Sequence, residues 1–76
     1  MFEELKGILT DELQIDENDI TPEASLSGDL GINSIQLADL IMICEEQFNI
    51  EIADDDIRGF VTVGDVAEYL DDLKSN

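Results

Sequence analysis

Residues 28–48 read GDLGINSIQLADLIMICEEQF, and this stretch decides the fold because a glycine-bearing loop passes there into a long apolar run. Asn33 is a preferred N-cap residue, and Gln36 stands three residues later, where a capping box places Glu or Gln. The pattern therefore predicts a helix over 34–48 whose first residue is Ser34.

The predicted helix has two apolar faces at about 100° per residue. The expected core face holds Leu37, Leu40, Ile41, Cys44 and Phe48. The opposite face holds Ile35, Ala38 and Met42, and around it stand Asp39, Glu45 and Glu46. Because packing in a small bundle needs only one apolar face, the second face predicts a docking surface for a partner with basic residues around an apolar groove. The alternative is that the long loop covers this second face.

Other segments predict further helices. Apolar residues at steps of three and four predict a helix over 2–14, with the stripe Phe2, Leu5, Ile8, Leu9 and Leu13. A short helical turn is expected over 54–59, and Thr62, paired with Asp65, is expected to cap a last helix that runs to about residue 73. Residues 48–52 are interpreted as an extended connection. The predicted fold is all-α: a small four-helix bundle with three longer helices, one short helix and a long first loop.

The first connection, over about 16–33, is long for a small domain and needs a structural reason. Aliphatic residues are spaced through it, so we expect it to be pinned to the core rather than free. These residues are Ile20, Leu26, Leu30 and Ile32. Thr21-Pro22-Glu23 predicts a local turn within it.

The chain has a formal net charge of −17, from twenty acidic and three basic residues. This balance argues against binding to nucleic acid or to an anionic membrane, because both need a basic surface. It favours the approach of basic partners. The single cysteine, Cys44, has no partner for an internal disulfide, and neither a secretory signal nor a membrane-spanning run is recognisable, so a cytoplasmic location is expected.

Ser34 is the chemically interesting residue of the central stretch. The chain has no histidine, so no histidine can activate this serine, and we expect no catalytic residues and no enzyme activity. Free backbone N–H groups and the positive end of the dipole make a helix start suited to a phosphate ester. The alternative is an ordinary serine in the first turn of a helix.

The stretch GDLGINSIQLADLIMICEEQFNIEI resembles the signature of acyl carrier proteins, in which a D-L-G-x-D-S-L run places a serine at the start of the second helix. ITPEASL is similar to the first-loop sequence of that family, and FNIEIADDDIRGFVTVGDVAEYL is similar to its third and fourth helices. The resemblance covers nearly the whole chain, so residues 1–76 are expected to form a single acyl carrier domain.

The resemblance implies that Ser34 carries 4′-phosphopantetheine, transferred from coenzyme A by a phosphopantetheinyl transferase. The arm would hold acyl intermediates as thioesters for fatty-acid or related lipid or polyketide synthesis. The family's recognition helix meets basic surfaces of loading and elongating enzymes, and its residues correspond here to Asp39, Met42, Glu45 and Glu46, with Ile35 beside them. The acyl chain would lie between helices among Leu40, Cys44, Phe48, Ile57 and Phe60. A monomer without a metal is expected.

Three residues beside the attachment position depart from the family pattern. The chain has Asn33-Ser34-Ile35 where the family usually has Asp-Ser-Leu, and Gln36 replaces an acidic residue that is common there. Because partners bind at this site, the departures indicate a specialised carrier with a restricted partner set rather than the general fatty-acid carrier.

Two other interpretations remain. One is a carrier of aminoacyl or peptidyl groups, although such carriers usually differ around the serine and carry less negative charge. The other is a calcium-binding module, because Asp54-x-Asp56-x-Arg58-Gly59, followed by five residues and then Asp65, partly matches the loop pattern D-x-[DN]-x-[DN]-G-x₅-E. Arg58 places a cation where a ligand oxygen belongs, and Asp65 is shorter than the usual bidentate Glu, so calcium binding is the weaker interpretation.

Overall fold

The computed structural model describes residues 1–75, which fold into helices joined by loops without a β-strand in this part of the chain. The helices are α1 (Phe2–Leu13), α2 (Ser34–Phe48), α3 (Asp54–Ile57) and α4 (Val63–Ser75), with a short 3-10 helix, η1 (Glu17–Asp19), after α1. The predicted all-α fold is confirmed, and the bounds of α2 are those expected from its sequence. The first helix ends one residue early because Gln14 adopts the left-handed conformation of a C-cap, with φ of 56°.

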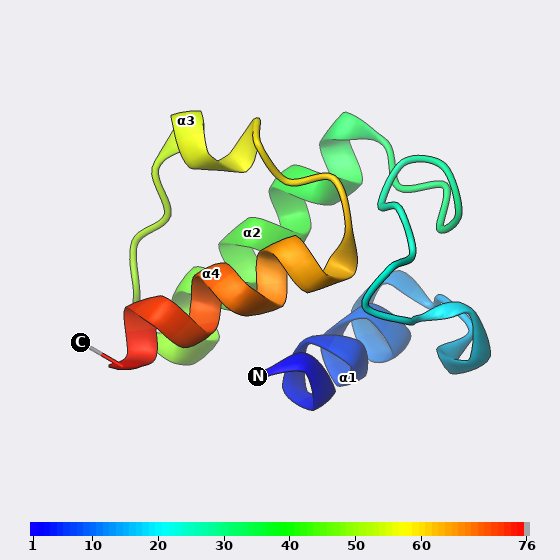
Figure 1. Ribbon diagram of the computed structural model, residues 1–76, viewed down its shortest axis with the longest axis horizontal. Coiled ribbons are helices and arrows are strands. Elements are labelled where there is room, and N and C mark those ends of the chain that lie inside the picture. The colour runs from blue at the N-terminus through cyan, green and yellow to red at the C-terminus, as the bar shows by residue number, and fades with distance from the viewer. Residues whose placement is uncertain (76) are drawn as a thin grey trace.

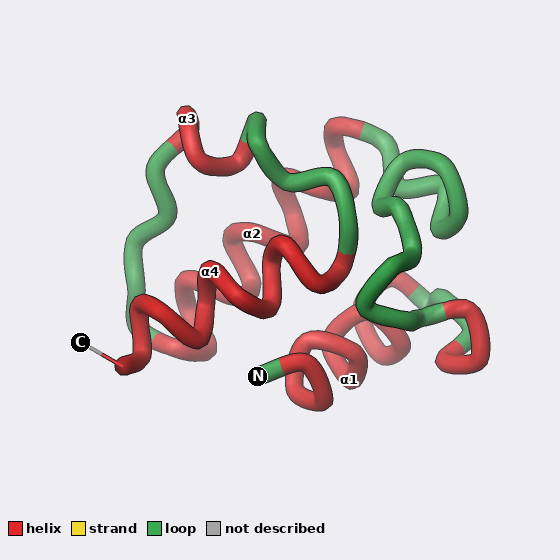
Figure 2. Tube along the Cα trace, in the orientation of Figure 1, coloured by secondary structure: helices red, strands yellow, loops and turns green. Residues whose placement is uncertain are grey.

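The three longer helices pack together, and α1 contacts both α2 and α4 (Figure 1). The short α3 lies apart from this packed group, beyond the connection that leaves α2. Figure 2 shows the long loop between η1 and α2 at the opposite end of the molecule from α3. The start of α2 therefore lies near this loop. The connection that leaves the far end of α2 runs back to α3, which shares a pocket with the first turns of α2.

The core is almost entirely aliphatic. Its largest fully buried side chains are Leu5, Leu9, Leu40, Leu70, Val63, Val66 and Cys44. No polar or charged residue in the described part of the chain is buried, so packing rather than a polar network holds the helices together. Within the same residues, no helix has the length and apolar character that crossing a bilayer demands.

The long first loop is pinned to the core, as its sequence predicts. Ile20, Leu26 and Ile32 are each less than 5% exposed, and Leu30 is half-buried against the same cluster. The expected turn after Ile20 is also present, because the Ala24 N–H donates to the carbonyl of Thr21 at 3.1 Å.

Backbone pairing fastens this loop to the segment before α4. The Leu26 N–H donates to the Val61 carbonyl at 2.9 Å, and the Val63 N–H donates to the Ala24 carbonyl at 3.0 Å. These bonds satisfy polar groups that a packed loop would otherwise leave without partners. Sequence periodicity predicts the apolar anchors of the loop but does not predict this antiparallel contact.

The predicted capping box at the start of α4 is confirmed. One carboxylate oxygen of Asp65 accepts from the backbone N–H groups of Thr62 and Val61, each at 3.0 Å, and Thr62 Oγ1 accepts from the Asp65 N–H at 3.2 Å. The bonds from Thr62 and then Val61 lower the pKa of the Asp65 carboxyl, because they favour its ionised form.

Side chains, rather than helix packing, hold α3 in place. Asp56 Oδ2 accepts a hydrogen bond from the Tyr69 hydroxyl of α4 at 2.7 Å. The ring of Phe60 meets the ring of Tyr69 edge to face, with centroids 5.3 Å apart. On the other side, Glu45 Oε2 accepts from the Ile52 N–H at 2.9 Å and ties the extended connection to α2.

Candidate functional site

Ser34 is the first residue of α2 and is exposed to solvent. The capping box predicted before it is formed, because Asn33 Oδ1 accepts from the Gln36 N–H at 2.8 Å and Gln36 Oε1 accepts from the Asn33 N–H at 3.1 Å. This cap fixes the backbone on both sides of Ser34 and leaves the serine hydroxyl outside the capping bonds.

The loop before Ser34 is built by the residues 29–31, whose structural roles the sequence does not reveal. The Ser25 N–H donates to Asp29 Oδ2 at 2.9 Å, and the Asp29 N–H donates to Ser25 Oγ at 2.8 Å, which closes the loop reciprocally. Gly31 has a φ of +65°, in the left-handed region that glycine adopts without strain. The Ile32 N–H then donates to the Leu26 carbonyl at 2.8 Å, so the chain enters α2 from a fixed position.

The start of α2 is favourable for a negative group. Its first turn contains no acidic residue, although acidic residues occupy the first turns of the other three α-helices. The positive end of the helix dipole is therefore not already neutralised by a carboxylate of the same turn. A phosphate ester on the Ser34 hydroxyl would gain this stabilisation.

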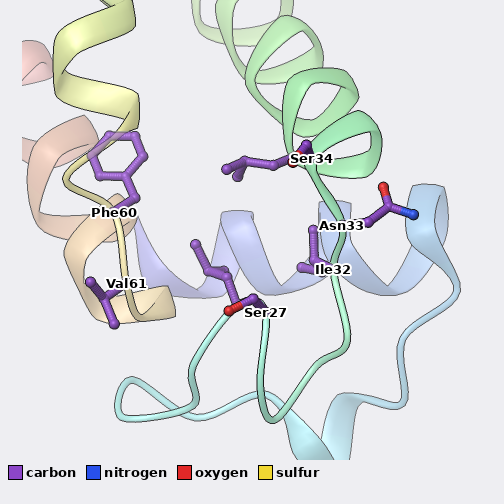
Figure 3. A pocket seen from close by; sticks show the side chains of 8 residues that line it. Ser27, Ile32, Asn33, Ser34, Phe60 and Val61 are labelled. Atoms are coloured by element: carbon purple, nitrogen blue, oxygen red, sulfur yellow. The ribbon is translucent and has the colours of Figure 1, made fainter.

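A pocket of about 210 Å³ opens beside Ser34 between the long loop, α2 and the segment before α4. Its lining consists of Leu26, Ser27, Ile32, Asn33, Ser34, Leu37, Phe60 and Val61. Figure 3 shows Phe60 and Val61 on one side of this pocket and Ile32, Asn33 and Ser34 on the other. The pocket thus joins segments that are far apart in the sequence.

A second and larger pocket, of about 410 Å³, lies between α2 and α3. Its lining consists of Ser34, Leu37, Ala38, Asp54, Ile57, Arg58 and Phe60. Ser34, Leu37 and Phe60 belong to both linings, so Ser34 lies at the edge of two mainly aliphatic and aromatic spaces. A flexible group attached to Ser34 has apolar surface within reach on either side of Leu37.

The structure separates the residues predicted to enclose an acyl chain. Ile57 and Phe60 line the larger pocket. Leu40 and Cys44 are fully buried, Phe48 is half-buried, and none of the three lines either pocket. Sequence reasoning assigned Leu37 to the core alone and missed it as a lining residue; its signal was its place one turn after Ser34 on the core side of α2.

The second apolar face of α2 is not covered by the long loop. Ile35 is 74% exposed and Met42 is 52% exposed, and both lie on the face opposite the core. Asp39 and Glu46 are exposed beside them, whereas Glu45 is partly buried and holds the connection to α3 through its bond to backbone. The residues predicted to dock a partner therefore form one accessible surface, with Glu45 at its structural edge.

The acidic residues that partly match a calcium loop are used elsewhere. Asp65 caps α4, Asp56 accepts from Tyr69, and residues 54–57 form a helix instead of a ligand loop. Residues 1–75 contain no group of three or more acidic, cysteine or histidine residues arranged to hold a metal ion.

Cys44 is a structural residue rather than a reactive one. Burial, and to a smaller extent the charge of Glu45, raises the pKa of its thiol from 9.0 to about 11. Near neutral pH the thiol is therefore protonated and poorly nucleophilic.

Comparison with known proteins gives one consistent family. The family model described as "Phosphopantetheine attachment site" matches residues 3–70. An acyl carrier protein of Clostridium perfringens (strain SM101 / Type A) is 47% identical over 70 residues, which cover 92% of each chain. An acyl carrier protein of Helicobacter pylori (strain J99) is 42% identical over 74 residues, which cover 97% of this chain and 95% of the relative.

Proposed function

Because the chain belongs to the acyl carrier protein family, it carries acyl groups as thioesters on 4′-phosphopantetheine, and we propose that Ser34 is the residue to which this arm is attached. The observation that carries the proposal is the position of the Ser34 hydroxyl, which is exposed at the start of α2 and at the edge of both pockets. Within this proposal, residues 1–76 act as a single carrier domain.

The residues around Ser34 fit the chemistry of the arm. The start of α2 favours the negative phosphodiester, and the aliphatic and aromatic lining near Leu37 and Phe60 provides apolar surface for the groups beyond it. When attached, the arm supplies a terminal thiol that holds the acyl group. In the loading reaction, Ser34 Oγ forms the new bond to the phosphorus that bears pantetheine. The pyrophosphate bond of coenzyme A breaks, adenosine 3′,5′-bisphosphate leaves, and the serine proton passes to the transferase.

The proposal assigns the catalysis to partner enzymes and not to this chain. The chain has no histidine, and the protonated Cys44 is buried. Ser34 therefore acts as an attachment point that a phosphopantetheinyl transferase activates. The lone thiol is consistent with a cytoplasmic location, where cysteines stay reduced.

The docking surface in this proposal is the exposed face of α2, formed by Ile35, Asp39, Met42, Glu45 and Glu46. In this proposal the chain acts as a monomer. Its partners are the transferase and the acyl-loading and chain-elongating enzymes, each with basic residues around an apolar contact surface. Their affinity, measured by calorimetry at increasing NaCl concentration, is then expected to fall. An affinity that salt does not change would contradict the electrostatic part of this assignment.

We also propose that the carrier serves a restricted set of enzymes of fatty-acid or related lipid or polyketide synthesis. Asn33, Ile35 and Gln36 support this, because they depart from the family pattern beside Ser34. Asn33 and Gln36 form a cap without a carboxylate. The acyl chain is placed among Ile57 and Phe60 first, with Leu40, Cys44 and Phe48 reached only if the core opens. Changing Asn33 to Asp and Ile35 to Leu together should widen the range of elongating enzymes that accept the protein, as measured by their initial rates.

The attachment site is tested by incubating the chain with coenzyme A and a promiscuous phosphopantetheinyl transferase. The intact mass should rise by one phosphopantetheine, and Ser34→Ala should abolish the gain. Ser27→Ala is the matched control, because Ser27 is an exposed serine in the lining of the smaller pocket and should leave the gain unchanged. No mass gain for the unaltered chain, with a transferase active on another carrier, would reject the proposal.

A further inference from the structure

Arg58 is the only arginine of the chain and lines the larger pocket together with Ser34. The two lysines lie elsewhere. Lys74 reaches from α4 to Glu4 of α1 at 3.8 Å, and Lys6 belongs to α1, which contributes no residue to the lining of either pocket described above. In a chain with a net charge of −17, one guanidinium is thus placed at the pocket that begins at Ser34.

The backbone around Arg58 is held at a defined position. Its N–H donates to the Asp54 carbonyl at 3.3 Å at the end of α3. Two residues before it, Asp56 bonds to the Tyr69 hydroxyl, and two residues after it, Phe60 contacts the Tyr69 ring. The backbone of Arg58 is therefore held in place, and the guanidinium is carried on a long, flexible side chain.

The ion pair of Arg58 with Asp55 is weak enough for another anion to replace the Asp55 carboxylate. Its Nη1 lies 3.8 Å from Asp55 Oδ1, and the two side chains are 81% and 94% exposed. Pairs that are exposed to this degree contribute little, because water and salt screen them. Asp54 also lines the pocket, so an anion that binds Arg58 must compete with the carboxylates of α3. A bidentate oxyanion is the group that a guanidinium binds best.

We propose that Arg58 binds an oxyanion carried by the arm on Ser34, which is either the phosphodiester of the arm or a carboxylate at the end of its acyl cargo. The inference rests on the proposed attachment at Ser34. Binding of the phosphodiester to Arg58 would hold the arm toward the larger pocket. Binding of a cargo carboxylate would in addition select carboxylated cargo over neutral cargo. The apolar residues Leu37, Ile57 and Phe60 then cover the rest of the arm.

The single arginine provides its own probe. Its Nε–Hε nuclear magnetic resonance signal is the only one of its kind in the chain, so it can be followed in the apo-protein, in the holo-protein, and in holo-protein loaded with butyryl or succinyl groups. Butyryl and succinyl have the same number of carbons and differ by a terminal carboxylate. A change from apo to holo identifies the phosphodiester, and a change from butyryl to succinyl identifies the cargo carboxylate. No change in either comparison overturns the proposal.

The phosphorus signal of the holo-protein gives an independent measurement. Arg58→Gln should shift this signal if the phosphodiester is bound, and the shift should vanish in about 1 M NaCl, where charges are screened beyond about 3 Å. For carboxylated cargo, Arg58→Gln should abolish the difference between the backbone amide spectra of succinyl and butyryl protein around residues 54–60. Lys6→Gln makes the same change in net charge away from the pocket and should do neither; equal effects of both variants would overturn the proposal.

The two proposals fail in distinguishable ways. A chain that gains no phosphopantetheine rejects the attachment at Ser34 and removes the basis for the role of Arg58. A chain that is loaded normally at Ser34, but whose Arg58 and phosphorus signals respond to neither anion, rejects the role of Arg58 alone.

Discussion

Cys44 shows at the scale of one residue how burial sets chemistry. Its side chain is fully buried in the core face of α2, and the pKa of its thiol is raised to about 11. In the unfolded chain the thiol returns to the usual value near 9.0. Between these two values the unfolded state has lost a proton that the folded state keeps, so folding stability should decline as the pH rises through this window.

The expected loss is about 2–3 kcal/mol between roughly pH 9 and pH 11, from two pKa units at about 1.4 kcal/mol each. It can be measured by urea unfolding of the wild type and Cys44→Ala across this range. The variant loses packing because it leaves a cavity, so the test compares how the stability of each protein changes with pH. Parallel slopes for the two proteins would contradict a raised thiol pKa.

Residue-scale features were predicted from the sequence where one residue acts on its near neighbours. The cap formed by Asn33 and Gln36 is local, so the spacing of these two residues in the sequence predicts it. The reciprocal bonds between Ser25 and Asp29 span only four residues, yet the sequence does not predict them. Their geometry depends on the conformation of the loop, which the periodicity of apolar residues does not predict.

At the scale of elements, α4 begins in direct contact with the long first loop. The Gly64 N–H donates to the Pro22 carbonyl at 2.9 Å, and a Cβ at position 64 would lie 2.8 Å from that same oxygen. Backbone atoms cannot move aside without breaking the pairing between the loop and the segment before α4. Gly64 is therefore required by the close approach of two elements.

Gly64→Ala should lower the free energy of unfolding by about 1–3 kcal/mol, the range for overpacking. Gly7→Ala is the matched control, because Gly7 lies inside α1 and a Cβ there would meet nothing within 4 Å. That variant should gain up to about 1 kcal/mol from helix propensity alone. Urea unfolding measures both, and a gain in both would show that the contact at Gly64 is not restrictive.

The helices themselves were predictable because their apolar residues repeat at helical spacing. The 3-10 helix Glu17–Asp19 was not predicted, since it buries no residue and so leaves no apolar pattern. The antiparallel contact of Leu26 with Val61 was also missed. Backbone bonds between distant segments depend on how the helices are packed, and this information is not local.

At the scale of the whole molecule, the net charge of −17 acts over dimensions of 31 × 22 × 20 Å. In about 0.01 M salt the Debye length is about 30 Å, so the carboxylates repel one another across the entire fold. In about 1 M salt the Debye length is about 3 Å, and only immediate neighbours interact. The charge that attracts basic partners therefore also destabilises the folded chain.

Added NaCl should consequently raise the free energy of unfolding while it weakens the binding of a basic partner to the exposed face of α2. Urea unfolding and calorimetric binding over the same salt series measure the two effects. Chloride is preferable to sulfate, because sulfate strengthens apolar burial by itself. Stability that stays constant or falls with NaCl would show that self-repulsion is not a significant cost.

The charge was predictable from composition, whereas the pockets were not. Both pockets combine the start of α2 with the later segment around Phe60, and the smaller pocket adds the earlier loop around Leu26. The family resemblance placed Leu40 and Cys44 beside the acyl chain, and both are fully buried in the packed core. Only the relative placement of three segments shows that the accessible space begins at Leu37.

The bond from Glu45 to the Ile52 N–H has a consequence for how such a protein can diverge. Asp39 and Glu46 are exposed and, within residues 1–75, make no side-chain hydrogen bond, so replacing them breaks no bond of the fold. Glu45 belongs to the proposed docking surface and also ties the connection before α3 to α2. Replacing Glu45 would change both together, whereas replacing Asp39 or Glu46 would change the proposed docking surface and leave the bond to Ile52 in place.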